Sequence, residues 1–352
     1  MAGCVTTLRM AGCAVMSKPP FHNGFCCTLS TLAVLTLVVC AASRLVSSDA
    51  PQRHDPAAWG SDHVGQPIPA YITGEQCLFC HRAKVGPTWS LNRHSLTIRD
   101  WDEKSPALVA LKQSPAKNLA DEIKFVMGDE RQQRFLKPAK AYGKLELLSV
   151  AWTPPRDKIP AQLTSTERPH WDANQFGNSC AGCHATAVDP QEQAFSAASL
   201  DCYVCHGNVP VEHANKRELA YLSPARKDEA RVVTSLCAQC HVRIGKSKST
   251  GLSYPNNFVA GDNLFRDFQI DFSDRALLSL STADRHVLEN VRDVVVFGQE
   301  TVTCLSCHDV HGRSSQKHHL VAKSEYCSNC HNAAGSKRAR KPFSNHSQTC
   351  GY

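Results

Sequence analysis

The chain of 352 residues carries 18 cysteines and 17 histidines, whereas only 7% of its residues are aromatic. These cysteine and histidine contents are far above those of an ordinary globular enzyme. The composition therefore indicates a core in which something other than aromatic side chains fills the space. The formal charge of +7 at pH 7 makes the polypeptide basic.

The first segment predicts export. No charged residue lies between Lys18 and Arg44, and residues 25–42 form an apolar run that ends in small residues. This pattern is typical of a signal peptide, which we place at residues 1–43. Because the run approaches the length of a membrane-spanning helix, an uncleaved N-terminal anchor stays open as the alternative. Residues 44–70 contain several prolines and glycines and are expected to form an extended lead-in.

One motif organises residues 71–350. Cys-x-x-Cys-His occurs six times and uses twelve of the cysteines. Short steps between the second, third and fourth copies predict closely packed sites. The last two copies define a C-terminal section at about residues 300–350. The six copies are Cys77/Cys80/His81, Cys180/Cys183/His184, Cys202/Cys205/His206, Cys237/Cys240/His241, Cys304/Cys307/His308 and Cys327/Cys330/His331.

Few regular elements are expected between the motifs. Gly86-Pro87 predicts the start of a helix through Trp89 and His94, because proline suits a first helical turn. Residues 123–127 and 144–152 have strand composition and predict a small antiparallel insert at about 120–155.

A second helix is predicted late in the chain. Valine and leucine recur at helical spacing over residues 287–295, after Ser281-Thr282 as a plausible cap. We expect this helix to end at Gly298. The remainder is expected to be loop.

The motif has the spacing of a haem attachment site. Two thiols three residues apart can form thioethers with the two vinyl groups of haem, and the adjoining imidazole reaches the iron. A zinc site built from two Cys-x-x-Cys pairs is the alternative, but zinc does not require the histidine that follows every pair here. A disulfide scaffold predicts no adjacent histidine either. The sequence therefore predicts six covalently bound c-type haems. The expected proximal ligands are His81, His184, His206, His241, His308 and His331.

This cofactor content sets the expected fold class. We expect a mainly α fold with extensive irregular structure, in which a multihaem cytochrome c array surrounds the small β insert. The array should form one continuous hexahaem domain over residues 71–350.

Three segments resemble known multihaem cytochromes. The run CLFCHRAKVGPTWSLNRH, which ends at His94, resembles the Cys-x-x-Cys-His…Trp-x-x-Ser-x-His pattern of the nitrifier tetrahaem cytochrome c family. The stretch CYVCHGNVPVEH, which ends at His213, resembles the same group, and CLSCHDVHG is similar to the doubled Cys-x-x-Cys-His class. In such families the trailing histidine ligates a haem. The resemblance thus implies His94, His213 and His311 as distal ligands.

The other distal ligands are less defined by the sequence. Ten histidines after residue 43 lie outside the motifs, and six would suffice for bis-histidine coordination of every haem. His286, near the start of the second predicted helix, and His346, near the C-terminus, are the next candidates. His170 competes with the pair His318/His319 for the sixth place.

Electron transfer is the predicted function. Bis-histidine haems suit a periplasmic carrier between a membrane or quinol-linked donor and a terminal acceptor, with redox proteins as partners. The alternative is an oxidoreductase that acts on a small nitrogen or sulfur species at one five-coordinate haem. Removal of residues 1–43 lowers the formal charge from +7 to +5, and six ferric haems with their propionates bring it to about −1, so charge gives nucleic-acid binding no support. Membrane association stays open.

Overall fold

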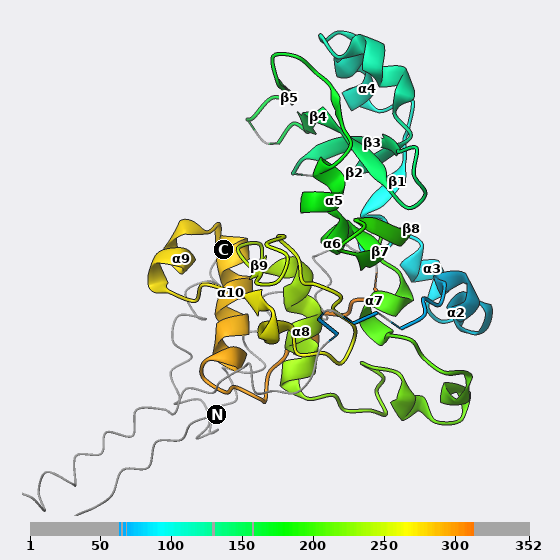
Figure 1. The fold of residues 1–352 in the computed structure, drawn as a ribbon, viewed down its shortest axis with the longest axis vertical. Coiled ribbons are helices and arrows are strands. Elements are labelled where there is room, and N and C mark those ends of the chain that lie inside the picture. The colour runs from blue at the N-terminus through cyan, green and yellow to red at the C-terminus, as the bar shows by residue number, and fades with distance from the viewer. Residues whose placement is uncertain (1–62, 65, 68, 129–130, 157, 313–352) are drawn as a thin grey trace, which may run out of the picture. The chain divides into compact units, whose positions relative to one another are not determined.

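The computed structural model describes residues 63–312 except 65, 68, 129–130 and 157 (Figure 1). The chain divides into two units, residues 1–52 and 53–352, and every described residue belongs to the second. The predicted signal segment and most of the lead-in lie outside the described residues. The same holds for the sixth motif, formed by Cys327, Cys330 and His331, and for His318, His319 and His346.

The first described helices surround the first motif. Helix α2 spans Gly74–His81 and begins after Thr73, whose hydroxyl accepts a hydrogen bond from the Gln76 backbone. Helix α3 spans only Gly86–Trp89, so the expectation of a helix through His94 is wrong. Beyond Trp89, side chains of Asn92 and Ser95 bond to nearby backbone groups, which competes with continued helix formation.

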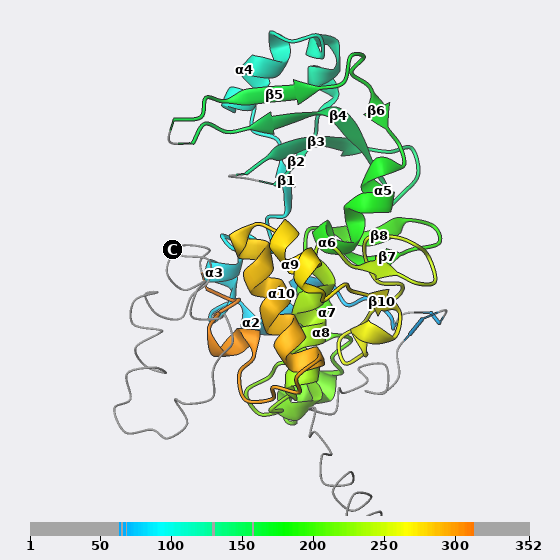
Figure 2. The ribbon, with the colours of Figure 1, turned by 90° about the vertical axis from the view of Figure 1, so that its left-hand side faces the viewer.

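A six-stranded antiparallel sheet follows (Figure 2). Its strands run in the order β1-β2-β3-β4-β5, with β6 paired to β4 beside β5. Strand β4 is the longest and pairs with three neighbouring strands. Buried and exposed residues alternate little along it, because both of its faces are largely covered. The strands are β1 (Ile98–Asp100), β2 (Phe125–Met127), β3 (Gln133–Pro138), β4 (Leu145–Thr153), β5 (Gln162–Ser165) and β6 (Trp171–Asp172).

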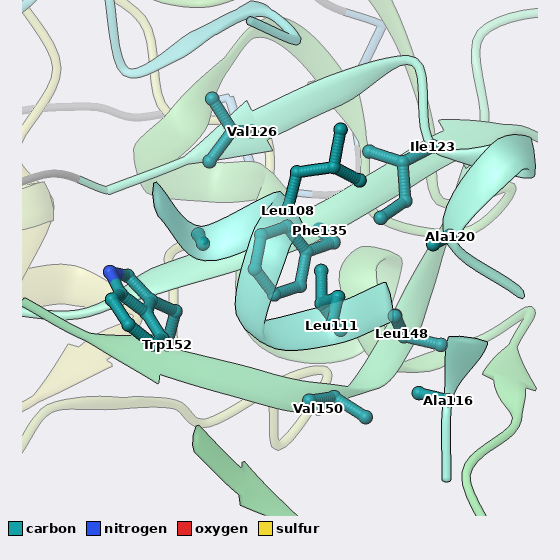
Figure 3. Close-up of a cluster of buried hydrophobic side chains, with 11 residues drawn as sticks. Leu108, Leu111, Ala116, Ala120, Ile123, Val126, Phe135, Leu148, Val150 and Trp152 are labelled. Atoms are coloured by element: carbon teal, nitrogen blue, oxygen red, sulfur yellow. The ribbon is translucent and has the colours of Figure 1, made fainter. Parts of the chain in front are cut away.

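One face of this sheet packs on its own hydrophobic core. Helix α4 (Pro106–Lys112) begins after Ser105, whose side chain accepts a hydrogen bond from the Ala107 backbone, and the 3₁₀ helix η2 spans Lys117–Glu122. Figure 3 shows the Phe135 ring beside Leu108 and Leu111 of α4. Phe135 and Leu111 are fully buried, and burial of such side chains stabilises a fold by about 1.5–3 kcal/mol each.

The expectation of a mainly α fold is therefore wrong. Strands extend from residue 98 to residue 172, well beyond the predicted insert at 120–155, and further two-stranded sheets occur later in the chain. The physical reason is that this section fills its core with its own side chains, so it needs regular hydrogen-bonded strands to satisfy the buried backbone.

The second and third motifs lie on short elements around a hairpin. The hairpin pairs β7 (Ala185–Asp189) with β8 (Ala194–Ala198). Phe176 of the preceding helix is buried in a cluster with Leu145 and Leu147 of β4, which connects these motifs to the large sheet. The other elements here are α5 (Gln175–Ser179), α6 (Ala181–His184), α7 (Cys202–His206), η3 (Val211–Ala214) and η4 (Arg217–Leu219).

Helices α8 (Ala230–His241) and α10 (Thr282–Val295) pack side by side (Figure 1). The predicted late helix is confirmed in α10, although it ends at Val295 and not at Gly298. Ser281 caps it by accepting a hydrogen bond from the Asp284 backbone, and Leu288 and Val291 are buried. None of the described helices is both long and apolar enough to cross a membrane. The remaining elements are β9 (Lys246–Ser247), η5 (Leu264–Arg266), β10 (Phe268–Gln269), α9 (Asp274–Ser279) and η6 (Cys304–Ser306).

Candidate haem attachment sites

Each of the five described motifs lies on or at the end of a helix. In α2, α6, α7 and α8 the histidine of the motif is the last helical residue, and the fifth motif begins in η6. Helical positions i, i+3 and i+4 share one face, so both cysteines and the histidine of a motif can address one group. None of the ten cysteines of these five motifs forms a disulfide. Sites 1 to 5 are numbered below in the chain order of their motifs.

Site 1 brings a predicted distal histidine opposite its motif. The ring centroids of His81 and His213 lie 6.1 Å apart at an interplanar angle of 24°. His213 lies in η3, and its Nδ1 is 2.8 Å from the carbonyl oxygen of Pro210. Because a carbonyl only accepts, Nδ1 carries the proton and Nε2 is left with its lone pair.

Site 3 pairs two segments that are far apart in the chain. The ring centroids of His206 and His311 lie 5.8 Å apart at 26°. Nδ1 of His206 donates to the Tyr221 carbonyl at 2.6 Å. The rings of Trp89 and His311 pack edge-to-face at a centroid distance of 6.3 Å. His311 therefore faces the third motif although it follows the fifth.

Site 4 pairs the last residue of α8 with a loop near the start of the described chain. The ring centroids of His94 and His241 lie 6.2 Å apart at 71°. Nδ1 of His94 lies 3.2 Å from Oδ1 of Asn92, which also accepts a hydrogen bond from the His94 backbone at 2.9 Å.

These three separations fit a metal between the rings. Two metal–nitrogen bonds of about 2 Å, with about 1 Å from each nitrogen to its ring centre, place the centroids of two imidazoles about 6 Å apart on opposite sides of one metal. Direct offset-stacked or edge-to-face ring pairs have centroids about 4.5–7 Å apart, so the observed separations are common to a direct ring contact and to a metal-bridged pair. The residues present therefore fit the iron of a c-type haem at sites 1, 3 and 4.

Site 5 lies close to the end of the described residues. The backbone N–H groups of Cys307 and His308 both donate to the carbonyl of Cys304, at 3.1 and 3.0 Å. One tight turn of chain thus carries the two thiols and the imidazole, which is the local arrangement that haem attachment needs. The role of His308 as a proximal ligand stays a prediction.

The sixth motif is not described by the structure. Attachment of a haem through Cys327 and Cys330, with His331 as its proximal ligand, stays a prediction that rests on the motif alone. The structure therefore bears on five of the six predicted sites.

Burial keeps two proximal histidines neutral. Burial lowers the pKa of His206, against the opposing effect of its bond to the Tyr221 carbonyl. Burial also lowers the pKa of His184 at site 2, where the backbone of Thr97 opposes the shift and Arg243 adds to it. The neutral imidazole is the form that ligates a metal.

Thiols of different motifs are neighbours. The side chains of Cys77 and Cys202 interact directly. Contacts of the same kind join sites 2 and 4 and sites 4 and 5. Their thiol pairs are Cys183 with Cys240 and Cys237 with Cys304. The attachment points of these sites therefore lie close together.

The remaining predicted distal ligands have other surroundings. His286 lies in α10 beside Asn290, whose amide donates to the His286 carbonyl at 2.6 Å. His170 is exposed at the edge of the large sheet, where its backbone and Nδ1 bond to Ser149 and Arg168. Their role as haem ligands stays a prediction.

Sequence reasoning missed the residues that orient the histidines. Asn92 is fully buried, but in the sequence it carries no mark of this role. His63 is one of the ten histidines after residue 43 that lie outside the motifs. Its Nδ1 lies 2.8 Å from the carboxylate of Asp262, 199 positions away. No local signal marks the contact of His63 with Asp262 or those of Asn92 with residues 310 and 312, because these partners are distant in the chain.

Part of this region is similar to a known protein family. Residues 172–252, which contain the second, third and fourth motifs, match the family model described as Cytochrome c3. No curated protein matches the chain. The solved undecaheme cytochrome from the S-layer of Carboxydothermus ferrireducens is similar with a TM-score of 0.43 and 16% identity, over 85% of this chain and 46% of that chain. The chain thus spans less than half the length of that protein.

The repeated motif and the family match point to the same class of protein. Residues 172–252 carry three copies of the motif and are similar to cytochrome c3, a similarity that implies covalently attached c-type haem. The six copies of the motif and this match are those expected of a multihaem c-type cytochrome, a class that transfers electrons.

Proposed function

We propose that the chain is an exported, periplasmic hexahaem carrier that passes electrons between a membrane or quinol-linked donor and a terminal acceptor. The observation that carries the proposal is the spacing of about 6 Å within the pairs His81/His213, His206/His311 and His94/His241. An iron held by two imidazoles has no open position for a substrate, which suits transfer of electrons rather than chemistry on a bound molecule.

The chain's own residues hold and orient the ligands. Bound haem supplies reversible one-electron transfer, and bis-histidine ligation favours a lower potential than Met/His ligation. Carbonyl oxygens of Pro210 and Tyr221 accept from Nδ1 of His213 and His206. Such bonds fix the ring orientation and raise the basicity of the ligating nitrogen.

The thiol contacts support a spatial order that differs from the sequence order. Site 1 neighbours site 3 through Cys77 and Cys202. The two thiols of site 4 face different motifs, since Cys237 interacts with Cys304 and Cys240 interacts with Cys183. Site 4 is then the common neighbour of sites 2 and 5.

Export and partners belong to the same proposal. The apolar run at residues 25–42 supports export, and donor and acceptor are expected to be redox proteins. Association with a membrane stays a prediction, as does the resemblance of residues 77–94 to the nitrifier tetrahaem cytochromes. Nucleic acid is not an expected partner.

Haem content and spin state test the proposal together. A haemochrome assay on the secreted protein should give six haems per chain, and low-temperature electron paramagnetic resonance (EPR) of the oxidised protein should show low-spin ferric haem at sites 1, 3 and 4. A large high-spin signal that shifts with nitrite, hydroxylamine or cyanide would instead support the oxidoreductase alternative.

A further inference from the structure

Asn92 is a buried side chain with every hydrogen-bonding position in use. Its relative exposure is 0%. Its Nδ2 donates to the carbonyls of Val310 at 2.7 Å and Gly312 at 2.8 Å. Its Oδ1 accepts from the backbone of His94 at 2.9 Å and faces Nδ1 of His94 at 3.2 Å. An asparagine side chain offers two donors and two acceptor lone pairs, so the set is complete.

The partners fix the orientation of this amide. A backbone N–H can only donate and a carbonyl can only accept, so Oδ1 must face His94 and Nδ2 must face residues 310 and 312. With Oδ1 as its neighbour, Nδ1 of His94 is the donor, which leaves Nε2 of His94 for a metal.

The two carbonyls that receive the amide flank His311. The residues that Asn92 joins are 218 and 220 positions away in the chain. The ring of Trp89, three residues before Asn92, packs edge-to-face with the ring of His311. Residues 89–94 therefore contact both His94 and the backbone that carries His311.

We propose that Asn92 is a positioning residue for two distal ligands at once, holding His94 toward site 4 and His311 toward site 3. This inference rests on the proposed ligation of haem by His94 and His311. Asn92 itself touches neither iron. Its Nδ2 bonds to the backbone on either side of His311, and its Oδ1 faces the backbone and Nδ1 of His94. One side chain thus links the proposed coordination of the haems at sites 3 and 4.

Two substitutions separate the two halves of this role. Asn92→Ala removes all four bonds, so the oxidised protein should lose low-spin signal or change haem methyl shifts at both sites 3 and 4. Asn92→Asp keeps oxygen acceptors for His94 but lacks the amide hydrogens for residues 310 and 312, so site 3 should change more than site 4. EPR and paramagnetic nuclear magnetic resonance (NMR) spectra of the full haem-loaded chain report each site.

Control variants make the outcomes distinct. His94→Met and His311→Met provide reference spectra, each expected to mark one haem. Asn263→Ala removes another buried asparagine, which caps η5 at the Phe265 backbone, and should lower stability without a change at sites 3 and 4.

Each outcome bears on a different claim. Changes at both reference haems in Asn92→Ala support the positioning role. If the two reference variants each mark one haem but Asn92→Ala alters neither, or alters all haems to a similar extent, the positioning role is overturned and the ligation stands. If neither reference variant changes any haem, the proposed ligation fails as well.

Discussion

Cys183 and Cys240 each place their sulfur on the backbone of the other's motif. Sγ of Cys183 lies 3.8 Å from the Gln239 carbonyl, and Sγ of Cys240 lies 3.7 Å from the Gly182 carbonyl. The contact is reciprocal, so the second and fourth motifs pack directly against each other. Gly182, whose carbonyl takes part in this contact, also lies against the ring of Tyr254.

Gly182→Ala should disturb this junction. A Cβ at position 182 would collide with the ring of Tyr254, whose hydroxyl donates to the Gly177 carbonyl at 2.6 Å. Overpacking of this kind costs about 1–3 kcal/mol, which denaturant unfolding followed by Soret absorption can measure. Gly86→Ala is the matched control, because a Cβ there meets only ordinary contacts at 3.8 Å. Equal stability of the two variants would contradict the packing described.

His213→Met should change one haem. Replacement of the imidazole by a thioether raises the potential of the haem held by Cys77 and Cys80. Redox titration should therefore show one upward-shifted component while the haem count stays constant, because the thioethers are untouched. A titration identical to that of the wild type would exclude His213 as a ligand.

His311→Met should act at a distance in sequence. Although His311 follows the fifth motif by three residues, its ring faces His206. The haem of Cys202 and Cys205 should shift in potential, and the haem of the fifth motif should shift less. Assigned haem methyl resonances in the NMR spectrum distinguish the two, and a larger shift at the fifth motif would refute the pairing.

The junction of sites 1 and 3 should respond to high pH through Tyr71. Its hydroxyl donates to Asp201 at 2.5 Å, and Asp201 also accepts from the Gly74 backbone at 2.8 Å. Burial first, and then the bond to Asp201, raise the pKa of Tyr71. Because folding raises this pKa, the contribution of the Tyr71 hydroxyl to stability is complete below about pH 10, which is the pKa of a free tyrosine. The contribution is lost as the pH rises above that value.

Tyr71→Phe removes this dependence. It should cost about 1 kcal/mol at pH 7, and the difference from the wild type should shrink as pH rises beyond 10. Urea unfolding at pH 7 and in alkaline buffers measures both values. A difference that grows with pH would contradict the described environment of Tyr71.

The sequence predicted what depends on local spacing. Helix α10 followed from valine and leucine at helical intervals, with Ser281 as its cap. The central strands around residues 125–127 and 145–153 were also predicted from composition.

What the sequence did not predict depends on distant partners. Strand β3 (Gln133–Pro138) has only Phe135 and Leu136 as large apolar residues, so its composition gave no strand signal, and its pairing with β2 and β4 defines it. Asn92 is likewise recognisable only once residues 310–312 lie beside it. Propensity and periodicity carry no information about such contacts.

Peptide mapping of the secreted protein by mass spectrometry tests the central claim most directly. The account predicts six peptides, each with one Cys-x-x-Cys-His motif and one haem joined through both cysteines. A colourless protein whose motif peptides carry free thiols, or whose thiols hold zinc, would contradict it.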